Sequence, residues 1–213
     1  QKLVKALLKT GKPLVLVLMN GRPLTIPWID EQAPAILEAW FPGTEAGNAI
    51  ADVLFGNYNP SGKLTTTFPR NIGQIPIYYN AKNTGRPLMP GDAPKFKSDY
   101  LDVANEPLYP FGYGLSYTTF TYSHIKMDKT SFRPGQSLTA SITITNSGNF
   151  DGEETVQLYI RDLVGSVTRP VKELKGFQKV FLKAGESKTV NFTITINDLK
   201  FYNSDLKFVA EPG

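Results

Sequence analysis

The sequence predicts an α/β domain followed by an all-β sandwich. In the first half, two apolar runs without alternation, residues 14–18 and 35–41, lie among segments with helical spacing. Beyond about Tyr117, apolar and polar residues alternate almost throughout. An unbroken apolar run is typical of a strand covered on both faces, whereas alternation is typical of a strand with one face toward a core. We therefore expect one domain at residues 1–117 and a second at 118–213.

The first domain is predicted to open with a helix and a buried strand. Apolar side chains recur at helical spacing over residues 3–9. Gly11 is a natural helix end, and Pro13 blocks continuation. The apolar run 14–18 then fits a strand of a sheet covered by helices, and the Asn20-Gly21 turn ends it.

A second strand and a second helix follow in the same order. The run 35–41 is the second strand, with a weaker signal than the first. Thr44 is suited to cap a helix over residues 45–55, and Gly56 ends that helix. Helix, strand, strand, helix is the order of an open α/β sheet.

A long loop separates these elements from the β region. Residues 74–110 are rich in Pro, Asn, Tyr and Asp and show little periodicity. Ordered loops of this length are uncommon in compact domains and are often functional.

The second domain carries three clear alternating runs, at residues 138–145, 156–160 and 190–196. Turn signals separate them at residues 146–148, 151–152 and 184–185. Short alternating strands punctuated by turns predict a β-sandwich.

Composition excludes several classes of function. The chain has no cysteine, which rules out disulfides, zinc-thiolate sites and a cysteine nucleophile. The net charge is +4, but the Lys and Arg residues are interspersed with Asp and Glu and form no basic stripe. We therefore expect no nucleic-acid partner. No apolar run approaches the roughly 20 residues that span a bilayer. The single histidine, His124, lies on a strand-like stretch, and no motif calls for a metal or cofactor.

Four segments carry a resemblance to a known family. They are GKPLVLVLMNGRPL at residues 11–24, PGTEAGNAIADVLFGNYNPSGKLTTTFP at 42–69, PLYPFGYGLSYTTF at 107–120 and RPVKELKGFQKVFLKAGE at 169–186. These strings are long and non-repetitive, and they spread over nearly the whole chain. The sequence resembles the family 3 glycoside hydrolases, in particular their periplasmic bacterial β-glucosidases.

The resemblance implies a layout. Family members carry a barrel-like domain, then an α/β sandwich, and in many cases a fibronectin type III-like domain. This chain would supply the C-terminal part of the α/β sandwich at residues 1–117 and a fibronectin type III-like domain at 118–213 that lacks its last strand. A sheet without that strand would expose an edge, so self-association of the fragment is expected.

The resemblance also implies an activity for the parent protein. It would be a periplasmic or secreted, exo-acting, retaining β-glucosidase that acts on β-glucosides or oligosaccharides and needs no cofactor. The barrel with the Asp nucleophile would be missing, so the fragment alone would be inactive. Two alternatives remain: another family 3 exo-glycosidase such as a β-xylosidase, or a non-catalytic, carbohydrate-associated structural module.

Asp92 is the weak candidate for a catalytic residue. In some family members the acid/base glutamate lies on the loop before the FGYGLSY segment, and Asp92 is the nearest acid by spacing. The matching glutamate motif is absent, so a role in a turn is the preferred interpretation.

Three further residues are candidates for positions near the substrate: Asn20, Arg22 and Trp40. Asn20 and Arg22 follow the first apolar run, and Trp40 lies near the carboxyl end of the second. Open α/β sheets bind ligands at the carboxyl ends of their strands. The alternatives are a plain Asn-Gly turn for Asn20 and Arg22, and core packing for Trp40, which is flanked by Ala39 and Phe41.

Overall fold

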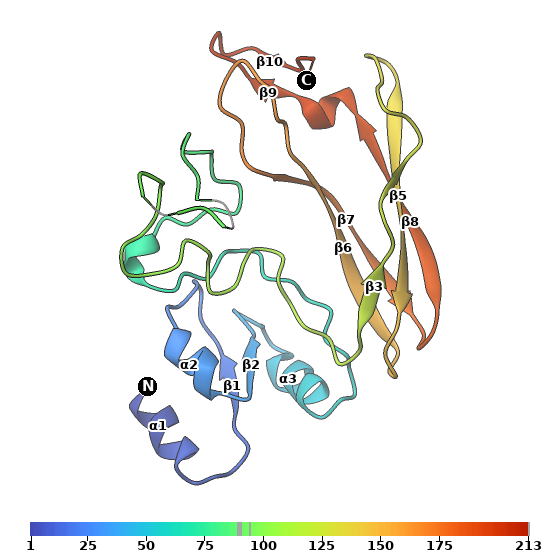
Figure 1. The fold of residues 1–213 in the computed structure, drawn as a ribbon. Coiled ribbons are helices and arrows are strands. Elements are labelled where there is room, and N and C mark those ends of the chain that lie inside the picture. Colours follow the sequence, from blue (N-terminus) through green and yellow to red (C-terminus); the bar gives the residue numbers. More distant parts are fainter. Residues whose placement is uncertain (89–90, 94, 213) are drawn as a thin grey trace. The chain divides into compact units, whose positions relative to one another are not determined.

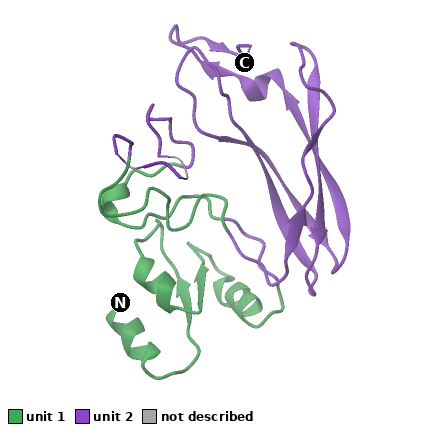
Figure 2. Cartoon of the chain, viewed as in Figure 1, with its two compact units in different colours: residues 1–58, 64–78, 99–113 green, residues 59–63, 79–98, 114–213 purple. Residues whose placement is uncertain are grey.

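The computed structural model describes residues 1–88, 91–93 and 95–212 (Figure 1). The chain forms two compact units (Figure 2). Unit 1 comprises residues 1–58, 64–78 and 99–113, and unit 2 comprises residues 59–63, 79–98 and 114–213. The units interleave along the sequence, and the domain boundary at 117/118 stays a prediction.

Unit 1 is built around two parallel strands. Its elements are α1 (Lys2–Leu8), β1 (Val15–Leu18), α2 (Pro27–Gln32), β2 (Ala35–Glu38), α3 (Ala46–Leu54) and the 3-10 helix η1 (Ile72–Gln74). β1 and β2 pair in parallel, with Val15 opposite Ala35 and Leu18 opposite Glu38. The predicted first helix, two strands and second helix are all present in the expected order.

Three details differ from the sequence prediction. Helix α2 was not predicted; it begins at Pro27, whose fixed φ and missing N–H suit a first helical position. Strand β2 ends at Glu38 because Trp40 turns into left-handed backbone, with φ of 50°. Thr44 is not the cap of α3: Glu45 holds that position, and its side chain makes no capping hydrogen bond.

The core of unit 1 centres on three buried side chains. Ile26 and Ile29 come from the start of α2, and Phe68, only 1% exposed, comes from a segment outside regular structure. Partly buried neighbours that pack against them include Leu16, Leu18, Trp28, Ile36, Trp40, Leu108 and Tyr109. The core therefore joins the sheet, α2 and the loop.

The described part of the long loop contains no named strand, as its lack of periodicity predicted. Between η1 and Phe120, the described residues form no helix or named strand. Phe68 donates its N–H to the Tyr109 carbonyl at 2.9 Å. The buried Gln74 accepts the Arg70 N–H at 2.6 Å and donates to the Ala104 carbonyl at 2.8 Å. Such side-chain bonds satisfy backbone groups that a sheet would otherwise pair.

Unit 2 is a β-sandwich. Its elements are β3 (Phe120–Tyr122), β4 (Lys126–Met127), β5 (Ser137–Asn146), β6 (Gly152–Ile160), β7 (Glu173–Leu182), β8 (Ser187–Thr195), the 3-10 helix η2 (Ile196–Leu199), β9 (Phe201–Tyr202) and β10 (Phe208–Val209). β5 pairs antiparallel with β3, β4 and β8, β6 pairs antiparallel with β7, and β9 with β10. Figure 1 shows the β5–β8 and β6–β7 pairs as two layers.

Both layers contribute alternate side chains to one core. Ile144 of β5 and Leu182 of β7 are fully buried, at 0% exposed. The other buried members are Leu138, Ala140, Val156, Leu158, Val180, Val190, Phe192 and Ile194. This arrangement confirms the three alternating runs of the sequence analysis and adds β7, which the sequence did not predict.

A buried ion pair fixes residues 59–63 to the sandwich within unit 2. Lys63 Nζ lies 3.1 Å from Glu154 Oε2 on β6, and their side chains are 15% and 11% exposed. Lys63 also donates to the Gly114 carbonyl at 3.1 Å, and the Tyr122 hydroxyl donates to Glu154 Oε1 at 2.7 Å. Burial, followed by this carboxylate, raises the pKa of Tyr122, so the hydroxyl stays protonated.

Candidate functional site

The carboxyl ends of β1 and β2 meet at one edge of the unit 1 sheet. Because the strands are parallel and Leu18 lies opposite Glu38, the residues that follow Leu18 lie beside the end of β2. Asn20 Nδ2 donates to Glu38 Oε2 at 3.4 Å and to the Arg22 carbonyl at 2.7 Å. In open α/β sheets this edge is where ligands bind.

Glu38 holds the backbone that turns after β2. Its Oε1 accepts the Trp40 N–H at 3.0 Å. Trp40 has a φ of 50°, a left-handed conformation that is costly for a bulky side chain and is often found at functional sites. Burial raises the pKa of Glu38, and the hydrogen bonds from Trp40 and Asn20 oppose that rise.

The Trp40 side chain heads a row of aromatic rings. Its ring centroid lies 5.9 Å from that of Phe68, and Phe68 meets Tyr109 edge-on at 5.7 Å. Tyr109 stacks on Tyr113 at 5.4 Å and donates its hydroxyl proton to Asp30. Trp40 thus packs into the core of unit 1, in line with the core interpretation of this residue.

Asn20 keeps one unused acceptor at this edge. Its Oδ1 is buried and has no hydrogen-bond partner within the described part of the chain. Arg22 contributes only its carbonyl to the network, and its side chain is exposed. The structure therefore brings Asn20 and Trp40 together through Glu38 and leaves the Arg22 guanidinium outside that network.

Asp92, the weak catalytic candidate, belongs to unit 2. Its carboxylate forms an ion pair with Lys97 at 3.0 Å, and both side chains are about one-third exposed. An exposed pair with a nearby lysine is the setting of an ordinary surface carboxylate. Its assignment to a turn and its assignment to catalysis both stay predictions.

Glu38 is the residue of this edge that the sequence analysis did not select. The signal was its place inside the apolar run 35–41, where a carboxylate is unexpected. Its role as acceptor for Trp40 depends on the left-handed turn, which no sequence pattern indicated.

Glu38→Gln should alter how the stability of unit 1 depends on pH. The folded-state pKa of Glu38 is raised above its ordinary value of 4.5, so the folded chain holds the proton more tightly than the unfolded chain. Stability should therefore fall as the pH rises from about 4.5 through the raised value, and the variant should lack this contribution. Thermal melts by tryptophan fluorescence across this range test it. The control is Glu31→Gln on the exposed side of α2, and identical pH dependence for wild type and Glu38→Gln would contradict the prediction.

No group of three or more His, Asp or Glu side chains among the described residues could hold a metal ion. None of the helices in the described part of the chain combines the length and apolarity needed to cross a bilayer.

Comparison with known proteins gives two domain matches. Residues 1–117 match the glycosyl hydrolase family 3 C-terminal domain, and residues 154–213 match the fibronectin type III-like domain. The two matches agree with the predicted succession of an α/β part and a fibronectin type III-like sandwich.

Curated relatives match along almost the entire chain. A periplasmic β-glucosidase of Salmonella typhimurium is 58% identical over 99% of the chain, and a β-xylosidase of Formosa agariphila is 48% identical over 100%. The chain spans 28% of the length of each relative. A β-glucosidase from Listeria innocua, solved in complex with isofagomine, covers 100% of the chain with a TM-score of 0.92 and 48% identity, and the chain covers 30% of it. On these matches, the chain belongs to glycosyl hydrolase family 3.

Proposed function

We propose that the chain is the C-terminal portion of an exo-acting, retaining β-glucosidase that releases terminal β-linked glucose from oligosaccharides or glycosides. The observation that carries this proposal is the 58% identity to a periplasmic β-glucosidase over 99% of the chain. The same relative supports a periplasmic or secreted location for the parent protein.

In this proposal the chain shapes the enzyme but does not perform the chemistry alone. Retaining hydrolysis needs two carboxyl groups about 5–5.5 Å apart, one as nucleophile and one as acid/base. The Asp92 carboxylate forms an ion pair with Lys97. The Glu38 carboxylate accepts hydrogen bonds from the Trp40 N–H and the Asn20 side chain. The nucleophile would come from a barrel domain outside these 213 residues, and the edge formed by Asn20, Glu38 and Trp40 would support one wall of the sugar pocket.

A chimera tests this role. The 211-residue matching stretch of the Salmonella typhimurium enzyme is replaced by this chain, and hydrolysis of an aryl β-glucoside is measured. We expect the chimera to retain activity and the purified 213-residue chain to show none. A folded but inactive chimera would contradict the proposal. Turnover by the chain alone, abolished by Asp92→Ala, would overturn the account of the site.

A β-xylosidase is the second candidate activity, favoured by the 48% identity to the Formosa agariphila enzyme over the whole chain. The ratio of aryl β-glucoside to aryl β-xyloside hydrolysis by the parent protein separates the two. A non-catalytic structural module is the third candidate, and it predicts that no parent protein with either activity exists.

Self-association of the chain stays a prediction, which light scattering at several concentrations tests.

A further inference from the structure

A cavity of about 350 Å³ lies in unit 2, inside the loop that joins β6 to β7. Its volume is within the range of sites that hold small ligands. The polar side chains that line it are Asn83, Arg161, Asp162, Ser166, Thr168 and Arg169. Asn83 comes from another part of the unit, held beside the loop by the hydrogen bond from the Val171 N–H to the Ala81 carbonyl at 2.9 Å.

Several anchored side chains fix the shape of this loop. Arg169 bonds Asp162 at 3.3 Å and Glu173 at 2.7 Å, and its guanidinium lies 4.2 Å from the centre of the Phe201 ring. The Ser166 N–H and hydroxyl both donate to the Glu211 carboxylate, at 2.8 and 2.7 Å. The Arg169 side chain is only 12% exposed, so the cavity is preformed around a mostly buried, fully paired charge.

The remaining polar groups of the cavity are mainly donors. Both Asp162 oxygens are engaged, one by Arg169 and the other by the Val164 N–H. Asn83 Oδ1 accepts the Gly85 N–H at 3.0 Å, which leaves the amide NH₂ to donate. The side chain of Arg161 has no partner among the residues that the structure describes.

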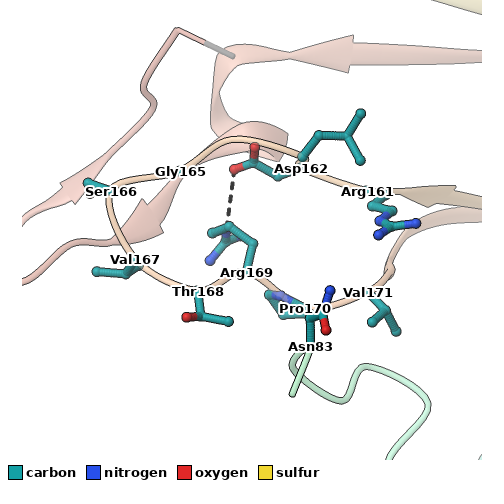
Figure 3. A pocket seen from close by; sticks show the side chains of 11 residues that line it. Asn83, Arg161, Asp162, Gly165, Ser166, Val167, Thr168, Arg169, Pro170 and Val171 are labelled. Atoms are coloured by element: carbon teal, nitrogen blue, oxygen red, sulfur yellow. Dashed lines mark hydrogen bonds and ion pairs between the residues drawn. The ribbon is translucent and has the colours of Figure 1, made fainter. Parts of the chain in front are cut away.

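Figure 3 shows how these groups lie around the cavity. Arg161 and Asn83 lie toward one end of it, and Ser166 and Val167 at the other. Thr168 lies on the loop between them, and Asp162 and Arg169 face each other across it. With Arg169 neutralised by Asp162 and Glu173, Arg161 is the uncompensated positive charge of the lining.

We propose that this cavity binds a monosaccharide-sized carboxylate, namely a uronic acid. A guanidinium binds a carboxylate with two parallel hydrogen bonds, which assigns the carboxylate to Arg161. The Asn83 amide and the Thr168 hydroxyl would then donate to the sugar oxygens. This site does not depend on the proposed hydrolytic activity, because it lies wholly in unit 2 and uses none of the residues of the unit 1 edge.

Titration of the 213-residue chain with D-glucuronate, followed by calorimetry, tests the site. D-Glucose is the neutral matched probe, and inorganic phosphate is the non-sugar anion. We expect glucuronate to bind at least about 10-fold more tightly than glucose, because charge-assisted hydrogen bonds exceed neutral ones in strength. The affinity should fall as the salt concentration rises. Equal binding of glucose and glucuronate, or phosphate binding as tight as glucuronate, would overturn the assignment.

Substitutions at one exposed position separate binding from folding. Arg161→Gln should weaken glucuronate binding roughly 10-fold, and Arg161→Lys should lie between it and wild type, since lysine keeps the charge without the planar fork. Lys188→Gln, at an exposed position of β8, removes the same charge away from the cavity and should leave binding unchanged. Wild-type affinity in Arg161→Gln, with an unchanged circular dichroism spectrum, would refute the proposal.

Discussion

Lys63→Met should destabilise unit 2 by about 3 kcal/mol, because it leaves the Glu154 carboxylate buried without its counter-charge. Only 11% of the Glu154 side chain is exposed. In the variant, the Tyr122 hydroxyl is the one partner left to this carboxylate among the described contacts. The Gly114 carbonyl loses a donor in the same step. Urea unfolding followed by far-ultraviolet circular dichroism measures the loss, and β-structure dominates that signal in this unit.

Two controls show whether burial is the cause. Lys207→Met breaks the pair with Asp205, whose side chains are 71% and 67% exposed, and should cost about 0.5 kcal/mol or less. Adding Glu154→Gln to Lys63→Met removes the buried charge, so the double variant should be more stable than the single one. Equal losses for Lys63→Met and Lys207→Met would show that the buried pair has no special weight.

Phe68→Ala should be the most damaging single change in unit 1, at about 3–5 kcal/mol. Phe68 is 1% exposed and lies between the rings of Trp40 and Tyr109, so its removal opens a cavity at the centre of the core. Only three buried apolar side chains form the centre of this cluster, which leaves little to refill the space.

Tryptophan fluorescence is the natural probe for this variant. Both tryptophans of the chain, Trp28 and Trp40, pack against the Phe68 cluster, so the signal reports on unit 1. Phe55→Ala is the matched control, because that ring is 83% exposed and its loss should change stability by about 0.5 kcal/mol at most. Similar denaturation midpoints for the two variants would contradict the packing described for Phe68.

The sandwich strands were predictable where one face alone carries the apolar residues. β5, β6 and β8 alternate because their inward side chains are apolar and their outward ones polar. β7 breaks this rule: Phe177 and Phe181 are 68% and 52% exposed, while Val180 and Leu182 are buried. Apolar residues on both faces of β7 hide the alternation in its sequence. The strand is recognised only from its pairing with β6 in the structure.

The unit 1 core and edge show a different limit of sequence reasoning. The burial of Phe68 depends on Tyr109, far along the chain, and its own segment has no periodicity to signal it. Asn20 and Trp40 were predictable as neighbours because they lie at the carboxyl ends of two predicted parallel strands. The role of Glu38 as acceptor for the Trp40 N–H was not predictable. It depends on a left-handed backbone conformation at Trp40 that a tryptophan rarely adopts.

The attachment of residues 59–63 to β6 limits how this sandwich could be transplanted. A gene segment starting at residue 118 would encode every strand of unit 2 yet omit Lys63, as well as Ser61, whose carbonyl accepts the Thr155 hydroxyl at 2.9 Å. Asn59, which donates to the Asp151 carbonyl at 2.9 Å, would be lost with them. Recombination of a contiguous gene segment that begins at residue 118 would therefore transfer a sandwich without residues 59–63. Natural transfer of the whole sandwich would need the upstream sequence as well.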